Sequence, residues 1–234
     1  MLLEFAEKTI AGIMFAAICV SLASYFGHAE LFDPIIVVTF LAIALLFRRN
    51  RDLVFVCMIF VIERGLEELV WRTLQNDIRF ELPAYLFFVY VSYVCAQGAL
   101  RWFALVFFVA SMAIDVYWHF TAEWAPFTLL TCYMMAASIV VRYALMRRVF
   151  WQIDIFDKSG TPMPLDIMLL RANACFIALH ALVTVEYYAR WFIDWDIDYL
   201  YYANSYIAHG LSVFILYMVV VESLRHLGTV ELNA

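Results

Sequence analysis

The side chains in this sequence that could do chemistry are ionisable residues standing inside long apolar segments. A charged side chain at the centre of a membrane helix costs about 2.5–3.5 kcal/mol or more, so such residues usually face protein or water. We therefore treat these residues as a candidate polar intramembrane cluster. They are Glu63, Arg64, Glu67, Glu68, Asp115, His119, His180, Glu186 and His209.

The segment 52–74 carries the densest group of these charges, the residues from Glu63 to Glu68. In a helix, which turns about 100° per residue, they fall within an arc of about 140°. Arg64 can reach Glu67 at i+3 and Glu68 at i+4. Three carboxylates against one arginine leave negative charge that must be protonated, matched by a cation or hydrated. Alternatively, Glu67 and Glu68 lie near the outer interface and are simply solvated.

Asp115 and His119 are four residues apart near the end of the segment 101–119. On a helix this spacing places both on one face, where the carboxylate can orient the imidazole or both can bind a metal. A local hydrogen bond between them is the simpler interpretation. The identity of any metal stays unknown at this stage.

The segment 167–191 carries a narrow polar stripe. Its members fall within an arc of about 60° around a helix and are Asn173, His180, Thr184 and Tyr187. Glu186 stands on another face, where it can pair with Arg190 at i+4.

The segment 199–224 carries Ser205, His209 and Ser212 at helical spacing. His180 and His209 both stand near the middle of adjacent segments and can face each other across a polar seam. Interhelical hydrogen bonding, worth about 0.6 kcal/mol on average in membranes, is the simpler reading. Ligation of a haem by the two histidines is an alternative.

The elements that must position these residues are apolar helices. Of the 234 residues 66% are hydrophobic and 15% charged, and the mean hydropathy is +0.85. A soluble domain has about 25% charged residues, and a membrane span needs roughly 20 apolar ones. We expect an all-α, polytopic transmembrane helical bundle forming a single integral membrane domain over 1–234. The eight expected spans are 6–26, 33–49, 52–74, 82–100, 101–119, 125–149, 167–191 and 199–224.

The chain could also be two parallel four-helix repeats, 1–100 and 101–234, with a cytoplasmic loop at 150–166 in the second half. The segment 29–34 resembles 122–126, and Glu63 stands in the first half where Glu186 stands in the second. Four spans per half would relate the repeats by an axis along the membrane normal.

Basic residues near the ends of the spans set the orientation. With the N-terminus inside, 11 of the 15 basic residues fall at cytoplasmic ends, three at outer ends and one, Arg64, within a span. We expect both termini in the cytoplasm and a multi-pass protein of a bacterial inner membrane. The N-terminus has no basic region or small-residue cleavage site, so the first span is expected to be retained. The cytoplasmic basic residues are Lys8, Arg48, Arg49, Arg51, Arg101, Arg142, Arg147, Arg148, Lys158, Arg171 and Arg225.

Three functions remain open on these grounds. Glycine is scarce, with 7 residues, which suits a rigid bundle more than a transporter with broken helices. There is no HExxH, GxSxG or Walker A motif, so the sequence leans against an enzyme and indicates no cofactor by motif. The leading hypothesis is a non-enzymatic structural or assembly subunit that docks other membrane proteins or a second copy in the bilayer. The second is a proton or cation channel or carrier that uses the Glu and His residues. The third is a membrane metal- or haem-binding protein. Nucleic acid is not an expected partner, because no strongly basic stretch is present.

Overall fold

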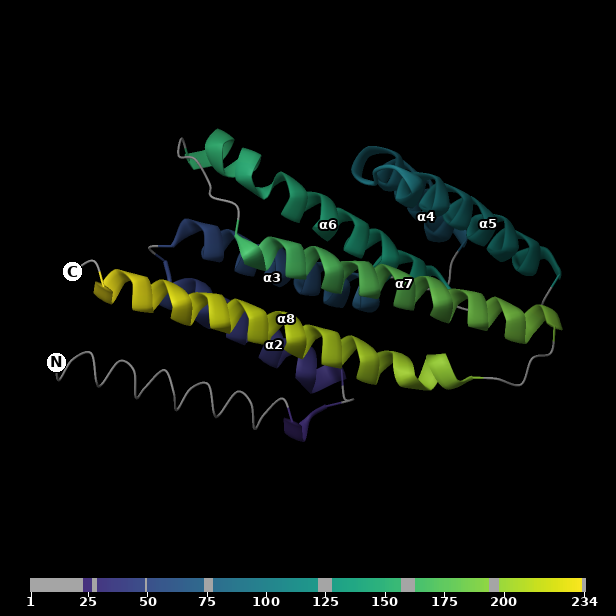
Figure 1. Ribbon diagram of the computed structural model, residues 1–234. Coiled ribbons are helices and arrows are strands. Elements are labelled where there is room, and N and C mark those ends of the chain that lie inside the picture. The colour runs from purple at the N-terminus through teal and green to yellow at the C-terminus, as the bar shows by residue number, and fades with distance from the viewer. Residues whose placement is uncertain are drawn as a thin grey trace. The chain divides into compact units, whose positions relative to one another are not determined.

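The computed structural model describes residues 23–26, 29–48, 50–73, 78–121, 128–156, 163–193 and 198–232. This part of the chain contains seven helices and no strand, as expected for an all-α protein (Figure 1). The helices are α2 (Ala29–Leu46), α3 (Arg51–Thr73), α4 (Ile78–Cys95), α5 (Ala99–Thr121), α6 (Leu129–Phe156), α7 (Pro164–Ile193) and α8 (Tyr199–Leu232).

Four of these helices are long and apolar enough to cross a membrane, counting within the described residues. They are α5, the part of α6 from Leu129 to Asp154, α7, and the part of α8 from Tyr199 to Ser223. The apolar stretches of α2 and α4, Leu31–Leu46 and Glu81–Cys95, are shorter. The charges from Glu63 to Glu68 keep α3 out of this group, although α3 has 23 residues. The expected first span, 6–26, lies almost wholly outside the described residues, so the expected count of eight spans is not supported here.

The chain divides into two compact units, one made of 1–61 and 205–234 and the other of 62–204. This division differs from the boundary at 100/101 between the expected repeat halves, which stay a prediction.

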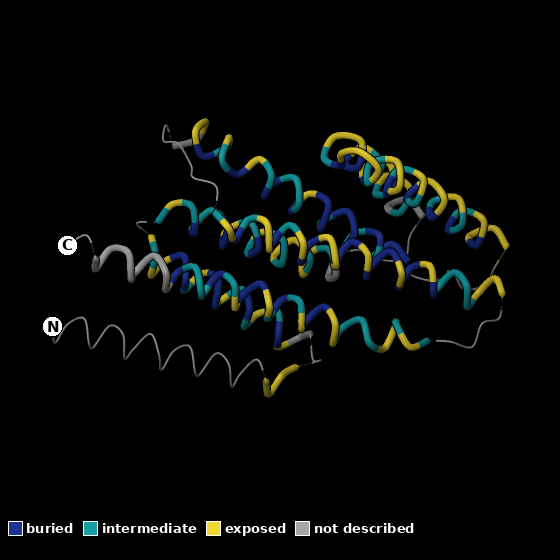
Figure 2. Tube along the Cα trace, viewed as in Figure 1, coloured by how far each residue is buried: buried dark blue, intermediate teal, exposed yellow. Residues whose placement is uncertain are grey.

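In the unit 62–204, α4 packs against both α5 and α6, and α6 packs against α7. The hydrophobic core at these contacts includes Phe88, Phe108 and Met135, each no more than 2% exposed. Figure 2 shows the buried positions of α6 and α7 gathered where the two helices run together. Burial of apolar side chains between helices therefore holds this unit together.

The ends of the helices follow from local chemistry. Only residues 96–98 separate α4 from α5, and Gly98 has φ +58°, a backbone conformation that glycine adopts at little cost. Helix α7 begins at Pro164, a residue favoured at the first helical position. The backbone N–H of Met163 donates to Asp166 Oδ2 at 2.9 Å, so Asp166 caps the same helix.

Both ends of the stretch 150–166, expected as a loop, are helical in the described residues. Helix α6 runs to Phe156 and α7 begins at Pro164, so both helices extend beyond their expected ends at 149 and 167. An ion pair joins α6 to the start of α7, because Arg148 Nη2 lies 2.7 Å from Asp166 Oδ2. The Arg148 side chain is fully buried, and its Nη1 also reaches Gln152 Oε1 at 3.4 Å. Charge pairing thus stabilises helix where polar sequence and two prolines indicated a loop.

Candidate functional site

Asp115, one of the predicted site residues, is buried on α5, where it is 5% exposed. The buried residues of α5 recur every three or four positions, and Asp115 follows Ser111 and precedes Trp118 on this stripe. Because of this spacing, the Asp115 carboxylate lies on the same buried face of α5 as the apolar side chains.

Three helices meet at this carboxylate. The Tyr85 hydroxyl of α4 donates a hydrogen bond to Asp115 Oδ2. The Thr128 hydroxyl, at the start of α6, lies 2.8 Å from Oδ1 and 2.7 Å from Oδ2 and donates to the carboxylate. Neither partner is a cation, and the ion pairs found among the described residues involve other acidic groups. Asp115 is therefore held by neutral hydroxyl groups alone.

More polar groups surround the Asp115 carboxylate. The Cys132 thiol lies 3.8 Å from the Tyr85 hydroxyl, and Ser111 and Tyr188 lie close to the same group of side chains. The buried oxygens Ser111 Oγ and Tyr188 OH have no protein partner that meets hydrogen-bond geometry. Because buried polar atoms are almost always hydrogen-bonded to protein or water, these oxygens mark positions where water would bind.

A threonine pair connects this cluster to the middle of α7. The Thr131 hydroxyl donates to the carbonyl oxygen of Thr128 at 2.9 Å. The Thr184 hydroxyl lies 2.8 Å from both Thr131 Oγ1 and the carbonyl oxygen of His180. Its single proton can serve one of these acceptors at a time, so the Thr184 hydroxyl can alternate between α6 and its own helix.

His180 is buried one turn before Thr184, at 3% exposed, and its Nδ1 has no protein partner. Its ring stacks on Phe176, with 6.0 Å between centroids. The Arg64 guanidinium lies over the same Phe176 ring at 5.8 Å from the centroid. Phe176 therefore brings two predicted site residues, His180 and Arg64, into one neighbourhood.

Arg64 pairs with Glu67 at 2.8 Å, as the i,i+3 spacing predicts. The side chains are 11% and 18% exposed, so this pair is largely shielded from solvent. Tyr133 of α6 lies near the carboxylates of Glu63 and Glu67. Glu63 is half-buried and Glu68 exposed, and both make further interactions.

The polar stripe of α7 faces the protein interior, as the sequence predicts. Asn173 and Thr184 are 1% and 0% exposed, and Tyr187 is half-buried. Asn173 Oδ1, like His180 Nδ1, is buried without a protein partner. We call the series from Asp115 through Thr128, Thr131 and Thr184 to His180 the polar column.

Glu186 holds the start of α8 in place. Its Oε2 accepts from the backbone N–H of Leu200 at 2.9 Å, and its Oε1 lies 3.4 Å from the N–H of Tyr201. The predicted pair with Arg190 is present at 3.3 Å. These contacts occupy both oxygens, so Glu186 serves as an external cap for α8.

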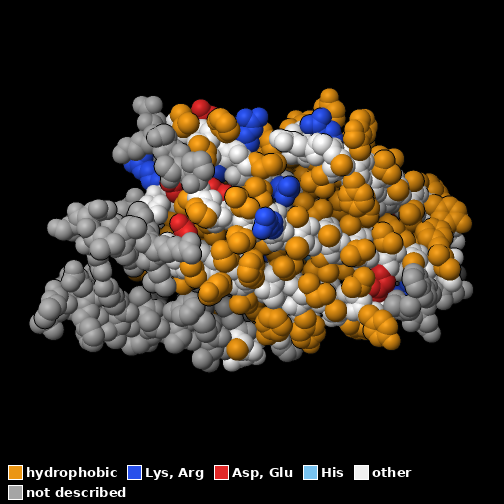
Figure 3. All heavy atoms as spheres, viewed as in Figure 1, with side chains coloured by type: hydrophobic (Ala, Val, Ile, Leu, Met, Phe, Trp, Pro, Cys, Tyr) orange, Lys and Arg blue, Asp and Glu red, His pale blue; other side chains and the backbone are white. Residues whose placement is uncertain are grey.

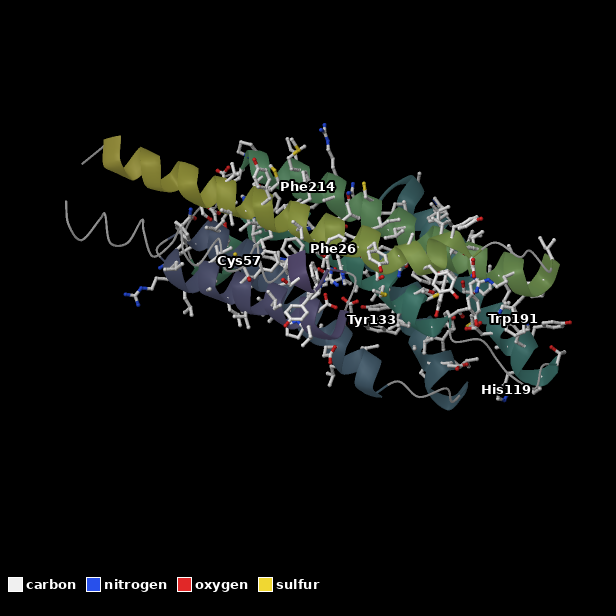
Figure 4. The ribbon with its side chains drawn as sticks, turned by 90° about the horizontal axis from the view of Figure 1, so that it is seen from below. Phe26, Cys57, His119, Tyr133, Trp191 and Phe214 are labelled. Carbon is white, nitrogen blue, oxygen red and sulfur yellow. The ribbon has the colours of Figure 1, made fainter. Side chains whose placement is uncertain are left out.

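The other two predicted histidines lie elsewhere. His119 is exposed, and Figure 4 shows it toward the same end of the unit as Trp191, away from Tyr133. Although Asp115 and His119 are four residues apart, Asp115 is buried and His119 is exposed, so they do not form one site. His209 belongs to the unit of 1–61 and 205–234, where its buried ring stacks on Phe32 with centroids 3.9 Å apart.

Sequence reasoning missed Tyr85, Thr128 and Tyr188. In the sequence, a tyrosine or threonine of an apolar segment is indistinguishable from an interface anchor or a spacer. Only its contacts with distant segments identify it as a site residue. No three His, Cys, Asp or Glu side chains gather as a metal site among the described residues.

Comparison with protein-family models, curated proteins and solved structures finds no match to this chain.

Proposed function

We propose that this protein conducts or exchanges protons through the polar column of its unit 62–204. The observation that carries the proposal is Asp115, a buried carboxyl group held by the Tyr85 and Thr128 hydroxyls in a helix that can cross a membrane. Carboxyl, hydroxyl and imidazole groups in series are the groups through which protons pass in membrane proteins.

The chemistry of the column favours protons over larger cations. Its members offer one carboxylate, several hydroxyls and one imidazole, and they pack among side chains that are nearly all buried. A metal cation prefers several oxygen ligands around one point. A proton needs only donors and acceptors that can exchange roles, which the hydroxyls of Thr131 and Thr184 provide.

Four of the buried atoms without a geometric hydrogen-bond partner support hydration of the column. Ser111 Oγ and Tyr188 OH lie beside Asp115, while His180 Nδ1 and Asn173 Oδ1 lie further along α7. A water bound to each group would supply its missing hydrogen bond.

Proton flux in liposomes tests the proposal. Purified protein is reconstituted with a pH-sensitive dye inside, and a potassium gradient with valinomycin supplies the driving voltage. We expect wild-type flux above that of protein-free liposomes and roughly tenfold lower flux for Asp115→Asn. His119→Gln, an exposed residue of the same helix, is the matched control and should keep the wild-type rate. Equal flux for Asp115→Asn and wild type would contradict the proposal.

A structural or partner-docking subunit is the second candidate, and the poor burial of α5 favours it. Only 22% of the residues in the most apolar stretch of α5 are buried, and Trp102 and Phe120 are 71% and 80% exposed. These side chains would contact lipid, another membrane subunit or a second copy. Native mass analysis in mild detergent tests this candidate, which a partner-free monomer would contradict.

We propose for either function a multi-pass protein of a bacterial inner membrane with both termini cytoplasmic. The excess of basic residues at one set of helix ends supports this orientation. The shorter apolar stretches of α2 and α4, together with α3, would add to the four long helices and bring the number of spans nearer to the expected eight.

A further inference from the structure

The turn between α4 and α5 borders a pocket that the polar column does not use. Its volume is about 310 Å³, and it opens to the surface. The lining combines six apolar or weakly polar side chains with the amide of Gln97 and the guanidinium of Arg142. The six are Cys95, Ala96, Leu100, Met146, Ala174 and Ile177.

Arg142 supplies this pocket with a positive charge. Its Nη1 donates to the carbonyl oxygen of Leu170 at 2.8 Å, which anchors the guanidinium to α7. Arg142 takes part in none of the ion pairs seen among the described residues, such as those of Arg64, Arg148 and Arg190. The remaining N–H groups of the guanidinium can bind an anion with two oxygens in its plane.

Further positive potential surrounds the pocket. Arg101 donates from Nε to the carbonyl oxygen of Ala96 at 2.9 Å, and its guanidinium lies 5.6 Å from the centroid of the Tyr93 ring. Helix α5, with 23 residues, begins at Ala99 beside the pocket, and a helix N-terminus favours anions. Figure 3 shows Lys and Arg side chains gathered over α6, α7 and the turn between α4 and α5.

The pocket lies on the side of the unit where α6 ends and α7 begins. Helix α6 continues ten residues past Met146 to Phe156, and α7 begins ten residues before Ala174, so both project about 15 Å beyond the pocket. The charged residues of these ends are Arg147, Arg148, Asp154, Asp166 and Arg171. On the other side of the pocket, α5 exposes apolar side chains such as Val106 at 68%. The pocket therefore stands at the boundary between a charged and an apolar zone.

We propose that this pocket binds the phosphate of an anionic phospholipid, with Arg142 on the phosphate oxygens. The acyl chains would lie along the exposed apolar side chains next to the pocket, such as Phe103, which is 49% exposed. Basic pockets between membrane helices are suited to anionic headgroups.

Native mass spectrometry of the detergent-purified protein tests the site with phosphatidylglycerol as the probe. We expect phosphatidylglycerol to stay bound and phosphatidylcholine to bind at least about tenfold more weakly. Arg142→Gln should lower phosphatidylglycerol binding by a similar factor. Arg147→Gln, a basic residue of the same helix outside the pocket lining, should keep wild-type binding. Equal binding of the two lipids, or full binding by Arg142→Gln, would overturn the proposal.

A second variant keeps the test valid if Arg142→Gln fails to fold. Ala174→Phe fills the pocket from an exposed position without changing any charge, and it should also displace phosphatidylglycerol. Inorganic phosphate distinguishes the source of the anion. The proposal predicts that millimolar phosphate does not compete with the lipid, because the acyl chains contribute to binding. Full competition by phosphate would instead indicate a site for the free anion and overturn the lipid assignment.

Discussion

The hydroxyl of Tyr85 on α4 donates a hydrogen bond to the carboxylate of Asp115 on α5, thirty positions further along the chain. Both side chains are buried, and Thr128 completes the contact from α6. This bond joins two neighbouring helices at the point where the polar column begins, so it can contribute both to stability and to proton exchange.

Removing the Tyr85 hydroxyl should destabilise the protein. Tyr85→Phe leaves one oxygen of Asp115 without a donor, at a cost of about 1–3 kcal/mol. Thermal unfolding in detergent, followed by circular dichroism, measures the loss. Tyr93→Phe is the matched control, because Tyr93 is on the same helix and 63% exposed. Equal stability of the two variants would show that the bond to Asp115 contributes nothing.

Glu186 should matter for stability as a hydrogen-bond acceptor. Glu186→Ala removes the acceptor for the Leu200 N–H and should cost about 0.5–2 kcal/mol, the range for loss of a helix cap. Glu186→Gln keeps one side-chain oxygen and should retain most of that stability. Chemical unfolding of the two variants separates the role of Glu186 as a hydrogen-bond acceptor from its role as a charge. If Glu186→Gln lowers stability as much as Glu186→Ala, the negative charge and its pair with Arg190 contribute most of the stabilisation.

The buried pair of Arg148 and Asp166 predicts strong coupling between the ends of α6 and α7. Arg148→Met alone should cost about 3–5 kcal/mol, because it leaves the Asp166 carboxylate without its partner. Arg148→Met combined with Asp166→Asn should cost clearly less than the sum of the two single changes. A double-mutant cycle on unfolding free energies measures this coupling, and additive effects would argue against it.

The orientation predicts where the ends of the chain lie. A reporter active only outside the cytoplasm, such as alkaline phosphatase, should be inactive when fused at either terminus, and a fluorescent reporter should be active. Activity of the phosphatase at one terminus alone would require an odd number of spans. Activity of the phosphatase at both termini would show that the orientation is the opposite of the predicted one.

The all-helical class and the local charge pairs were predictable from composition and helical spacing. Apolar composition and the lengths of the segments predict membrane-crossing helices, and four of the described helices meet those criteria. The pairs of Arg64 with Glu67 and of Glu186 with Arg190 also follow from sequence, because side chains three or four apart share a helix face.

Which polar residues come together depends on how the helices pack against each other. His119 shares the helix of Asp115, yet it is exposed while Asp115 contacts Tyr85 and Thr128. Arg148 appeared in the sequence as a residue at a cytoplasmic helix end, and its pairing with Asp166 makes it one of the most buried side chains. Spacing along a helix fixes a face, but the residues that face it come from distant segments. The packing of α4, α5, α6 and α7 brings those partners together, and they cannot be predicted from the sequence of any one helix.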